Sequence, residues 1–314
     1  MNTVRGRTER AVDVVCFGVI APATLLIVED LPPWNTGATV SRVDEFISDD
    51  AAIVATLLRR WEVRSALIGT TLGDDPQGRQ ASQRLRDMGI VGEFPTSPDV
   101  RTPYELNISD RSGGRTYFWK RDPEVLATLD TADLSSIRGA LALYADWYDG
   151  DHVLRPLREA RRLGVRVFFN IENGHEDPQF VARYAPYVDY AQAITDAAQK
   201  GREWRDVAAL LLRAGIGTVL VTMASQGCAA ADSSGWVQVR APELDVVDAC
   251  GAGAALSAGY LYGLLKGWSM DVCLRFAVAA SSLSCTDVGP KAFPIHEVRS
   301  LAASLSVETG SSLA

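Results

Sequence analysis

Hydrophobic residues follow two different spacings in the first part of this 314-residue chain. Short apolar runs at 13–18 and 65–69, each ending in glycine, predict buried strands. Apolar residues recur at helical spacing over 49–61 and 76–88. The pattern therefore predicts two strands of a larger sheet, each followed along the chain by a helix.

Two further segments of this first part predict a small separate sheet. Residues 24–47 alternate between apolar and polar positions around two prolines and a glycine. The runs 104–110 and 115–121 flank Gly113-Gly114, a pair that supplies the turn of a β-hairpin. We expect strands from about 24–47 and 101–122 to form this small sheet.

From about residue 134 the pattern changes to strands that alternate with helices. The expected strands are 139–146, 165–171 and 217–223, the helices 151–163, 178–186 and 196–214, followed by a hairpin at 227–242 and apolar helices at 252–267 and 270–285. Such alternation indicates βαβ units and a mostly parallel sheet covered by helices on both faces. The fold class is therefore α/β.

Composition and charge narrow the classes of function. Hydrophobic residues make up 47% of the chain and charged residues 22%, as in ordinary globular proteins. The net charge is −8, which argues against nucleic acid and anionic membranes as partners. No uncharged apolar stretch reaches the roughly 18 residues of a membrane helix. A small-molecule ligand remains compatible, because a nest of backbone amides can bind a phosphate on an acidic protein.

Five cysteines are present, and no CxxC motif occurs. An odd number without paired spacing argues against structural zinc or a disulfide framework and favours the cytoplasm. The polar segments 1–11 and 304–314 are expected to be flexible tails, and the first is not followed by a signal-peptide pattern. Without a repeat or a low-complexity linker, residues 12–300 are expected to form one domain.

The segment with the most specific chemistry is a glycine-rich turn. A strand expected to end at Val247 runs into Asp248, then into Gly251-Ala252-Gly253 and a helix. Small residues at a helix N-terminus let backbone amides face an anion, and the helix dipole adds to the attraction. Neither a Walker A loop nor a Rossmann GxGxxG is matched. A tight turn with close helix packing explains the glycines equally well on spacing alone.

The residues around this turn resemble the C-terminal signature of the ribokinase-like (PfkB) family of carbohydrate kinases. Further resemblances, in matching order, are Gly73-Asp74-Asp75 with Gly78, Gly114-Arg115-Thr116, Val221 to Gly227 (VTMASQG) and Val288-Gly289. They extend over about residues 12–300. Each motif alone is weak, whereas their combination is specific.

The resemblance implies a Rossmann-like three-layer α/β/α core with a small β-sheet lid. It also implies ATP and Mg²⁺ as cofactors, and transfer of the γ-phosphoryl group to a hydroxyl of a sugar-like or nucleoside-like substrate. By position, the amides of Gly251, Ala252 and Gly253 would form the anion hole. Thr222 and Gly227 would line the nucleotide site.

The chain departs from the family pattern at the residues that ordinarily do the chemistry. The position of the catalytic base is Ala254, which cannot accept a proton. On the substrate side, a family Asp aligns with Ala23, a Gly-Gly pair with Ser48-Asp49 and an Asn with Ile53. The motif linked to magnesium falls near 195–198 and is not preserved, although Asp196 could face a metal.

Three explanations account for these departures. The first is an Asp→Ala substitution introduced at 254 to trap a complex. The second is a pseudokinase that binds a nucleotide or metabolite without turnover. The third is an active enzyme with another substrate and a relocated base. Loss of a general base costs about 10²–10⁴-fold in rate, which cripples a kinase without abolishing it.

Several residues could replace the lost chemistry, and each has a structural alternative. Asp49 and Asp50 could place carboxylates in the substrate pocket or could cap the helix that follows. Asp248, predicted beside the cofactor, could reach a cation or could hold the turn. Cys250 could have a lowered pKa at the helix N-terminus or could pack as a small apolar residue.

Three polar side chains and one aromatic run complete the candidate site. Arg115 in the lid hairpin, and Asn170 with Glu172 at a strand end, are candidates for substrate contacts. A solvated strand end would explain the latter two equally well. The aromatic residues 117–119 could cover a ligand, mediate a homodimer through the lid or pack on the core.

Overall fold

The computed structural model describes residues 12–110, 114–195 and 203–313, and these form a large nine-stranded sheet. Its strand order is β15-β14-β13-β12-β11-β10-β9-β1-β4. The strands are β1 (Val14–Gly18), β4 (Ser65–Gly69), β9 (Ala142–Asp146), β10 (Arg166–Glu172), β11 (Tyr190–Ile194), β12 (Thr218–Thr222), β13 (Cys228–Asp232), β14 (Trp236–Val239) and β15 (Val307–Gly310).

The pairing of these strands places their chemistry at one edge. The strands from β4 to β12 in the sheet order pair in parallel, and β13, β14 and β15 continue antiparallel. Parallel strands end at the same edge, so Gly18, Asp146, Glu172 and Thr222 lie together there. In open α/β sheets the carboxyl edge is where ligands bind.

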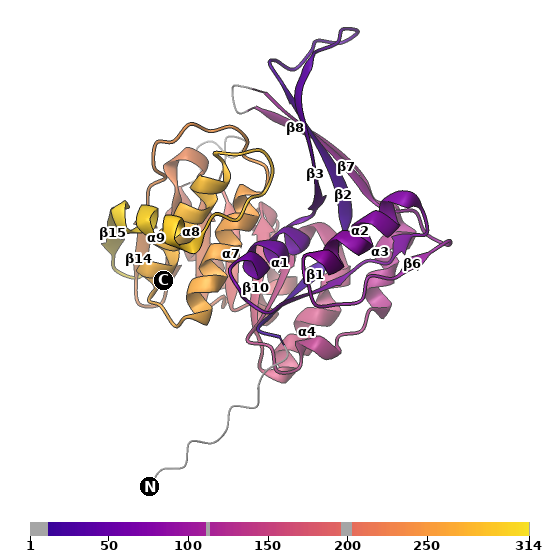
Figure 1. Cartoon of the computed structure of the whole chain (residues 1–314). Helices are drawn as coiled ribbons and strands as arrows, with labels where there is room; N and C mark the ends of the chain where they lie inside the picture. The colour runs from indigo at the N-terminus through magenta and orange to yellow at the C-terminus, as the bar shows by residue number, and fades with distance from the viewer. Residues whose placement is uncertain (1–11, 111–113, 196–202, 314) are drawn as a thin grey trace.

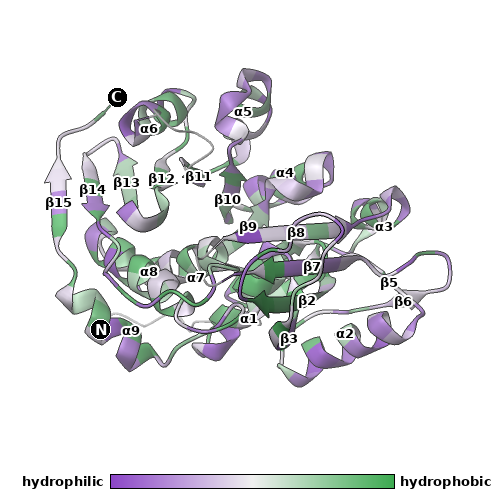
Figure 2. Ribbon diagram, turned by 90° about the horizontal axis from the view of Figure 1, so that it is seen from above, coloured by the Kyte–Doolittle hydropathy of each residue, from purple (hydrophilic) through white to green (hydrophobic). Residues whose placement is uncertain are grey.

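Helices cover both faces of the sheet, as Figure 2 shows from above. The helices are α1 (Asp50–Arg60), α2 (Pro76–Asp87), α3 (Pro123–Ala127), α4 (Leu154–Leu163), α5 (Pro178–Tyr184), α6 (Trp204–Arg213), α7 (Ala252–Leu265), α8 (Met270–Ser284) and α9 (Ile295–Ser304). α1, α2, α7, α8 and α9 lie on one side, and α3 to α6 lie on the other. The predicted three-layer α/β/α core is therefore confirmed.

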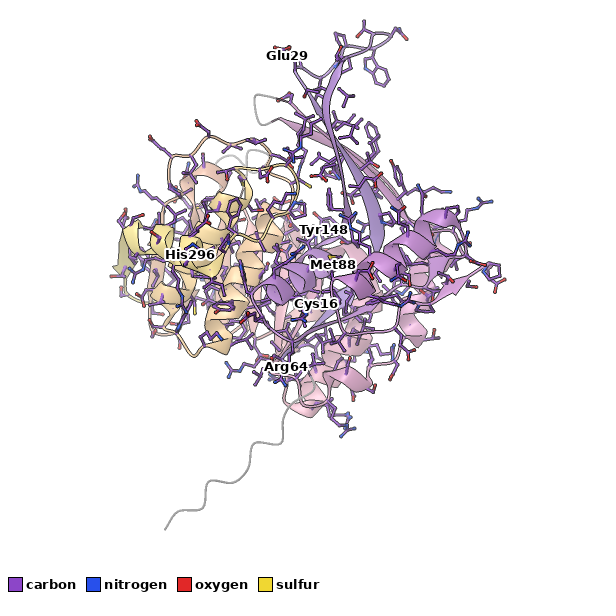
Figure 3. The ribbon with its side chains drawn as sticks, viewed as in Figure 1. Cys16, Glu29, Arg64, Met88, Tyr148 and His296 are labelled. Carbon is purple, nitrogen blue, oxygen red and sulfur yellow. The ribbon has the colours of Figure 1, made fainter. Side chains whose placement is uncertain are left out.

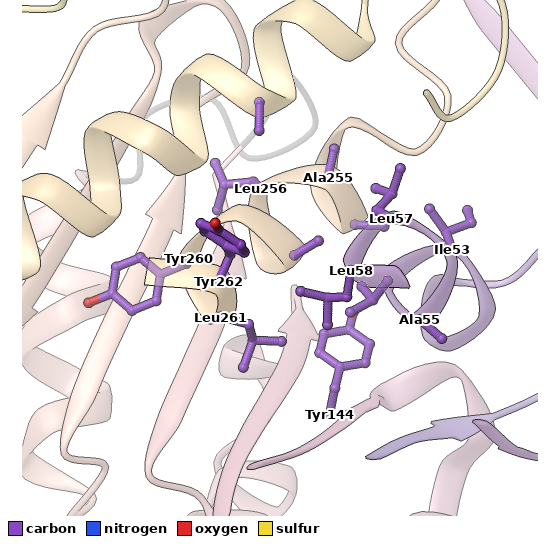
Figure 4. Packing of buried hydrophobic residues seen from close by; sticks show 14 of the residues in the cluster. Ile53, Ala55, Leu57, Leu58, Tyr144, Ala255, Leu256, Tyr260, Leu261 and Tyr262 are labelled. Carbon is purple, nitrogen blue, oxygen red and sulfur yellow. The ribbon is translucent and has the colours of Figure 1, made fainter. Parts of the chain in front are cut away.

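Alternation along β1 explains why both layers are apolar. Val14 and Cys16 pack into the core beneath α1 and α7, while Val15 and Phe17 pack into the opposite core. Successive strand residues point to opposite faces, so a strand buried on both sides must be apolar throughout. Figure 4 shows the first core, where Leu58 of α1 and Leu261 of α7 lie near Tyr144 of β9.

The predicted lid is a four-stranded sheet that projects from the core (Figure 1). Its order is β3-β2-β7-β8, from β2 (Ala21–Val28), β3 (Val40–Ser48), β7 (Tyr104–Ser109) and β8 (Arg115–Lys120). A two-stranded sheet of β5 (Leu72–Gly73) and β6 (Thr96–Ser97) lies outside both. The strand ranges expected for the lid agree with these, while Gly113 of the predicted turn lies outside the described residues.

Two expectations about segment ends need correction, and two elements were missed. The segment 304–314 is not a flexible tail throughout, because β15 pairs with β14 as the last strand of the sheet. No strand ends at Val247, whose N–H instead donates to the carbonyl oxygen of Cys285. The strand β11 and the helix α9 were not expected from the pattern. The predicted tail at 1–11 lies outside the described residues.

The expectations of no disulfide framework and no membrane helix can be compared with the structure. All five cysteines are unpaired, and four of them are buried. Among the helices of the described ranges, none is long and apolar enough to cross a membrane.

Candidate active site

A cavity of about 710 Å³ lies between the inner face of the lid and the carboxyl edge of the large sheet. Its walls come from α1, the lid strands β7 and β8, the turn after β9, and the glycine turn before α7. Tyr148, which lines it, lies where the lid meets the core (Figure 3). Pockets of this size, with a few convergent polar groups, are typical of small-molecule sites.

The glycine-rich turn reaches this cavity through Cys250 and Gly251. Gly251 caps α7 with a left-handed φ of 76°, and an added Cβ would lie 2.8 Å from Pro290, so glycine is required. The N–H of Ala252 donates to Ala249 within the turn. This bond removes one of the three amides expected for the anion hole and leaves those of Gly251 and Gly253 at the N-terminus of α7.

Asp248 holds the turn in place. Its carboxylate accepts hydrogen bonds from Ser109 Oγ of β7 at 2.8 Å, from Cys250 N at 3.1 Å and from Gly289 N at 2.9 Å. With 1% of its surface exposed, the carboxylate connects the lid, the glycine turn and the loop after α8. This geometry favours the turn-holding alternative over a cation ligand. The neighbouring Cys250 is not activated, because burial raises the pKa of its thiol to about 12.

The residue expected at the position of the family base, Ala254, lies in an apolar and closed environment. Ala254 lies in the first turn of α7, is fully buried and does not line the cavity. A carboxylate reaches the cavity from the facing helix instead, since Asp50 is the first residue of α1. Its Oδ2 accepts hydrogen bonds from Asn170 Nδ2 at 2.8 Å and from the Tyr144 hydroxyl at 3.5 Å.

The surroundings of Asp50 shift its ionisation. Burial raises its pKa to about 7, and the negative charge of Glu172 adds to the rise. The hydrogen bond from Asn170 opposes it. Asn170 itself is buried, so the alternative of a solvated strand end is wrong for this residue. The hydroxyl of Tyr144 also lies beside Ser257, one turn beyond Ala254 on α7.

Asp49, which the resemblance aligns with a glycine, has a glycine-like backbone conformation. Its φ is 77°, a left-handed value that is unusual for a residue with a side chain. The side chain accepts from Asp50 N and forms an ion pair with Arg121, 3.0 Å from Oδ2 to Nη2. Burial nevertheless raises the pKa of Asp49 to about 6, against the opposing charge of Arg121.

The lid supplies a carboxylate next to Ala23, the residue that the resemblance aligns with an Asp. Ala23 of β2 is buried and does not line the cavity, but its register partner on β7 is Glu105, which does. Glu105 accepts a hydrogen bond from Asn107 at 2.8 Å. Ile53 also lines the cavity, where it presents an apolar surface in place of the family Asn.

Two arginines enter the cavity from the ends of β8. Arg115 lines it near Cys250 and Gly251, and Arg121 pairs with Asp49 and lies 3.8 Å from Glu105. Burial opposes the charged form of Arg115, yet the neighbouring Cys250 and Asp248 keep its pKa above the ordinary value. These two arginines place one cation close to the glycine turn and another close to α1, and a third cavity arginine, Arg183, is paired with Asp151.

The predicted nucleotide loop lies further along the same edge. Thr222 ends β12, its hydroxyl donates to Ala193 O at 3.3 Å, and neither it nor Gly227 lines the cavity. Gly227 has a φ of 91°, and an added Cβ would collide with Val239 O. The backbone is thus held close to β14, which only glycine permits.

The described residues contain no cluster of three or more His, Cys, Asp or Glu side chains arranged to bind a metal ion. Asp196, the residue expected to face a metal, lies outside the described ranges. A magnesium ion in a kinase is commonly held by one or two carboxylates together with substrate phosphates. The residues described do not form a metal site by themselves.

Sequence reasoning missed several cavity residues. They are Glu105, Arg121, Trp147, Tyr148, Asp151, Asp177, Phe180 and Arg183, and the buried Asp146 and Asp149 lie behind them. A partial signal was present, because Asp146 is the last residue of an expected strand, at the edge where ligands bind. Of the expected substrate residues, Asp49, Ile53 and Arg115 line the cavity, and Asn170 contacts it through Asp50.

A three-layer α/β/α core with a β-sheet lid over its carboxyl edge is the fold of the ribokinases. Ribokinase from Thermotoga maritima matches with a TM-score of 0.76 at 16% identity, over 93% of this chain and 99% of its own. Arabidopsis thaliana ribokinase complexed with ribose and ATP matches with a TM-score of 0.73 at 17% identity, over 93% and 99%. Residues 35–297 match the family described as pfkB family carbohydrate kinase, so the chain belongs to that family.

Similar sequences carry kinase names as well. Acarbose 7(IV)-phosphotransferase of an Actinoplanes strain is 26% identical over 87% of this chain and 92% of its own length. Fructoselysine 6-kinase of Escherichia coli is 29% identical over 74% and 86%. ATP is the phosphoryl donor expected for this family, usually with Mg²⁺.

Proposed function

We propose that this protein is an active ATP-dependent phosphotransferase with a relocated base. It transfers the γ-phosphoryl group to a hydroxyl of a small sugar-like or nucleoside-like acceptor in the cavity beneath the lid. One observation carries the proposal: the carboxylate of Asp50 and the glycine turn at Gly251 line the same cavity from facing helices. The carboxylate missing at Ala254 is thereby replaced from across the cavity.

The position and ionisation of Asp50 suit a general base. Asn170 and Tyr144 fix one of its oxygens, at 2.8 and 3.5 Å, and the other is free to meet an acceptor hydroxyl. Its pKa of about 7 lies near neutral pH, where a base is both ionised and able to take a proton. Asp49, with its carboxylate paired to Arg121, is poorly placed for the same task.

The reaction follows from these groups. Asp50 accepts the proton of the acceptor hydroxyl, and the oxygen of that hydroxyl forms a bond to the γ-phosphorus. The bond from that phosphorus to the bridging oxygen breaks, and ADP leaves. Negative charge on the phosphoryl oxygens is stabilised by the amides of Gly251 and Gly253 and by Arg115. This sequence uses only side chains and amides of the described residues.

Binding without turnover is the second candidate function. The full burial of Ala254 favours it, because no carboxylate stands on α7 where the family has its base. A pseudokinase would still hold a nucleotide at the glycine turn and a metabolite under the lid.

One assay separates the two. ATP consumption is followed over a panel of sugars, polyols and nucleosides, with nucleotide binding measured by calorimetry. We expect turnover by the wild-type chain, and we expect Asp50→Asn to lose about 10²–10⁴-fold in kcat with little change in KM. Asp49→Asn, the adjacent matched control, should change KM more than kcat. Binding without turnover by the wild type would support the pseudokinase.

The outer face of the lid supports a proposal about assembly. Strand register places Leu26, Val43, Leu106, Ile108 and Phe118 on the face opposite the cavity, and Phe118 is 60% exposed. An apolar sheet face of this kind is typical of a protein–protein contact. We propose that it pairs with a second copy of the lid. The unpaired cysteines support a reducing compartment such as the cytoplasm.

A further inference from the structure

The inner wall of the cavity carries more carboxyl groups than guanidinium groups. Asp49, Asp50 and Glu105 line it, and Asp146 and Asp149 lie behind them, fully buried. Arg115 and Arg121 line the cavity beside this wall, and a third cavity arginine, Arg183, is paired with Asp151. Uncompensated buried carboxylates are costly, so such a set needs a further cation or retained protons.

Four of the carboxylate oxygens have no hydrogen-bond partner among the described residues. They are Oδ2 of Asp49, which forms the ion pair with Arg121, Oδ2 of Asp146 and both oxygens of Asp149. Asp146 and Asp149 are 0% and 1% exposed. The N–H of Val19 is near enough to lower the pKa of Asp149, but it makes no hydrogen bond of normal geometry with it. Buried polar groups in native proteins almost always have partners, so these oxygens need one.

The oxygens of Asp146 and Asp149 lie behind the cavity wall and do not line the cavity. An added Cβ on Gly18 would lie 2.8 Å from Asp149 Oδ2, 3.7 Å from Asp146 Oδ2 and 2.9 Å from Ala51 Cβ at the start of α1. Asp149 belongs to the turn after β9, whose neighbours Tyr148 and Gly150 line the cavity. The two carboxylates thus converge on the carboxyl end of β1, beside α1.

Burial and mutual repulsion keep protons on these groups when no cation is near. Burial raises the pKa of Asp146 and of Asp149 well above the ordinary value, and the charges of Asp149 and Asp49, respectively, add to it. Arg121 opposes both shifts but is already paired with Asp49 at 3.0 Å. One guanidinium cannot satisfy three carboxylates.

Aromatic side chains complete a surface suited to a cation. Tyr117, Trp119, Trp147, Tyr148 and Phe180 line the cavity. Two of these rings already receive guanidinium groups, at 5.8 Å for the pair of Arg121 with Tyr148 and at 5.4 Å for the pair of Arg115 with Tyr117. Ring faces attract ammonium groups in the same way.

We infer that the phosphoryl acceptor is a hydroxylated molecule that also carries a protonated amine. The ammonium group binds at the part of the wall that Asp49 and Glu105 line, against the ring of Tyr148, with the buried carboxylates of Asp146 and Asp149 behind that wall, while a hydroxyl faces Asp50. This inference rests on the proposed function, because it names the class of acceptor for the same cavity. It explains why a sugar-sized space has an acidic wall with unpartnered carboxylates buried behind it.

Calorimetry without nucleotide tests this inference directly. The probes are matched pairs: glucosamine against glucose and N-acetylglucosamine, and 1-amino-1-deoxysorbitol against sorbitol. Within each pair we expect the amine to bind at least about tenfold tighter, since each 1.4 kcal/mol is a factor of ten. Equal or tighter binding of the neutral partners would overturn the inference, as would no binding by any member.

Isosteric variants locate the effect. Asp149→Asn should reduce the preference for the amine about tenfold while changing the affinity for the neutral partner less. Asp146→Asn serves the same purpose if Asp149→Asn does not fold, as judged by its thermal unfolding. An unchanged preference in a folded variant would overturn the assignment of these carboxylates.

The outcome is independent of turnover. An amine preference in a chain that never consumes ATP would sustain the inference about the ligand and contradict the proposed kinase activity. Turnover on neutral acceptors with no amine preference would support the proposed kinase activity and contradict the inference about the ligand.

Discussion

At the scale of single residues, we propose that neighbouring elements supply the carboxylates that the resemblance places at Ala254 and Ala23. The family position on α7 is Ala254, and the cavity-facing carboxylate is Asp50 on α1. Likewise, the position in β2 is Ala23, and the carboxylate next to it is Glu105 on β7. In each case a neighbouring element supplies the acid, which keeps the cavity acidic although two alignment positions are alanine.

Ionisation of Asp50 predicts a dependence of stability on pH. Its pKa rises from 3.8 in the unfolded chain to about 7 in the folded protein, so the folded state binds its proton more tightly. Its stabilising contribution is therefore complete below about pH 4 and is lost as the pH rises through about 7. Asn at this position takes up no proton.

The free energy of unfolding of Asp50→Asn, relative to wild type, should thus shift in favour of the variant between pH 5 and pH 8. Urea unfolding at both pH values measures the difference. Asp99→Asn, at an exposed loop position, is the control and should show no such change. If the free energies of unfolding of Asp50→Asn and wild type differ by the same amount at both pH values, the raised pKa of Asp50 is contradicted.

At the scale of elements, the lid and the core are connected through one buried side chain. Asp248 accepts from β7, from the glycine turn and from the loop after α8. Hydrogen bonds to a charged group contribute about 1.5–3 kcal/mol each, and their loss inside a protein is not compensated by water. This carboxylate therefore fixes both the lid and the amides of the turn.

Asp248→Ala should lower the free energy of unfolding by about 3–5 kcal/mol. Asp248→Asn is the matched control, because its amide oxygen can still accept from Ser109 and Cys250, and it should lose less. Unfolding in denaturant measures both variants. A loss below about 1 kcal/mol for the alanine variant would show that these contacts are not the ones that hold the turn.

Elements with strong periodicity could be predicted from the sequence. The apolar strands β1, β9 and β10 and the helices α1 and α7 lie where the pattern placed them. The strand β11 reads YAQAI, whose central Gln192 interrupts the apolar run, although it is buried and bonds Ser257. The edge strand β15, VETG, is polar and mostly exposed, so its sequence carries no strand signal.

The candidate site was predictable only where its residues share a local motif. The glycine turn and Asp49 belong to such motifs. By contrast, Asp50 and Asn170 lie 120 residues apart along the chain, and only the parallel sheet brings them within 2.8 Å. A single sequence carries no signal of such long-range contacts. The sequence could therefore suggest Asp50 as a carboxylate of the substrate pocket, but it could not decide between that role and a helix cap.

At the scale of the whole molecule, the lid has two faces with different tasks. The inner face carries Glu105, Asn107, Tyr117 and Trp119 toward the cavity, and the outer face carries the apolar residues Leu26, Val43, Leu106, Ile108 and Phe118 among polar ones. If the outer face pairs with a second copy, Phe118→Lys should produce monomers in sedimentation velocity. Val91→Lys, at another exposed apolar position, should leave the mass unchanged. A wild-type monomer at micromolar concentration would contradict the pairing.

The whole account depends on Asp50 acting as the base in a working kinase. The most direct measurement is the pH dependence of kcat/KM for the wild type beside Asp50→Asn. With a pKa of about 7, the wild-type rate should fall about tenfold per pH unit below pH 7 and level off above it. The variant should be slower and independent of pH over that range. A flat wild-type profile, or a variant as fast as wild type, would contradict the central claim.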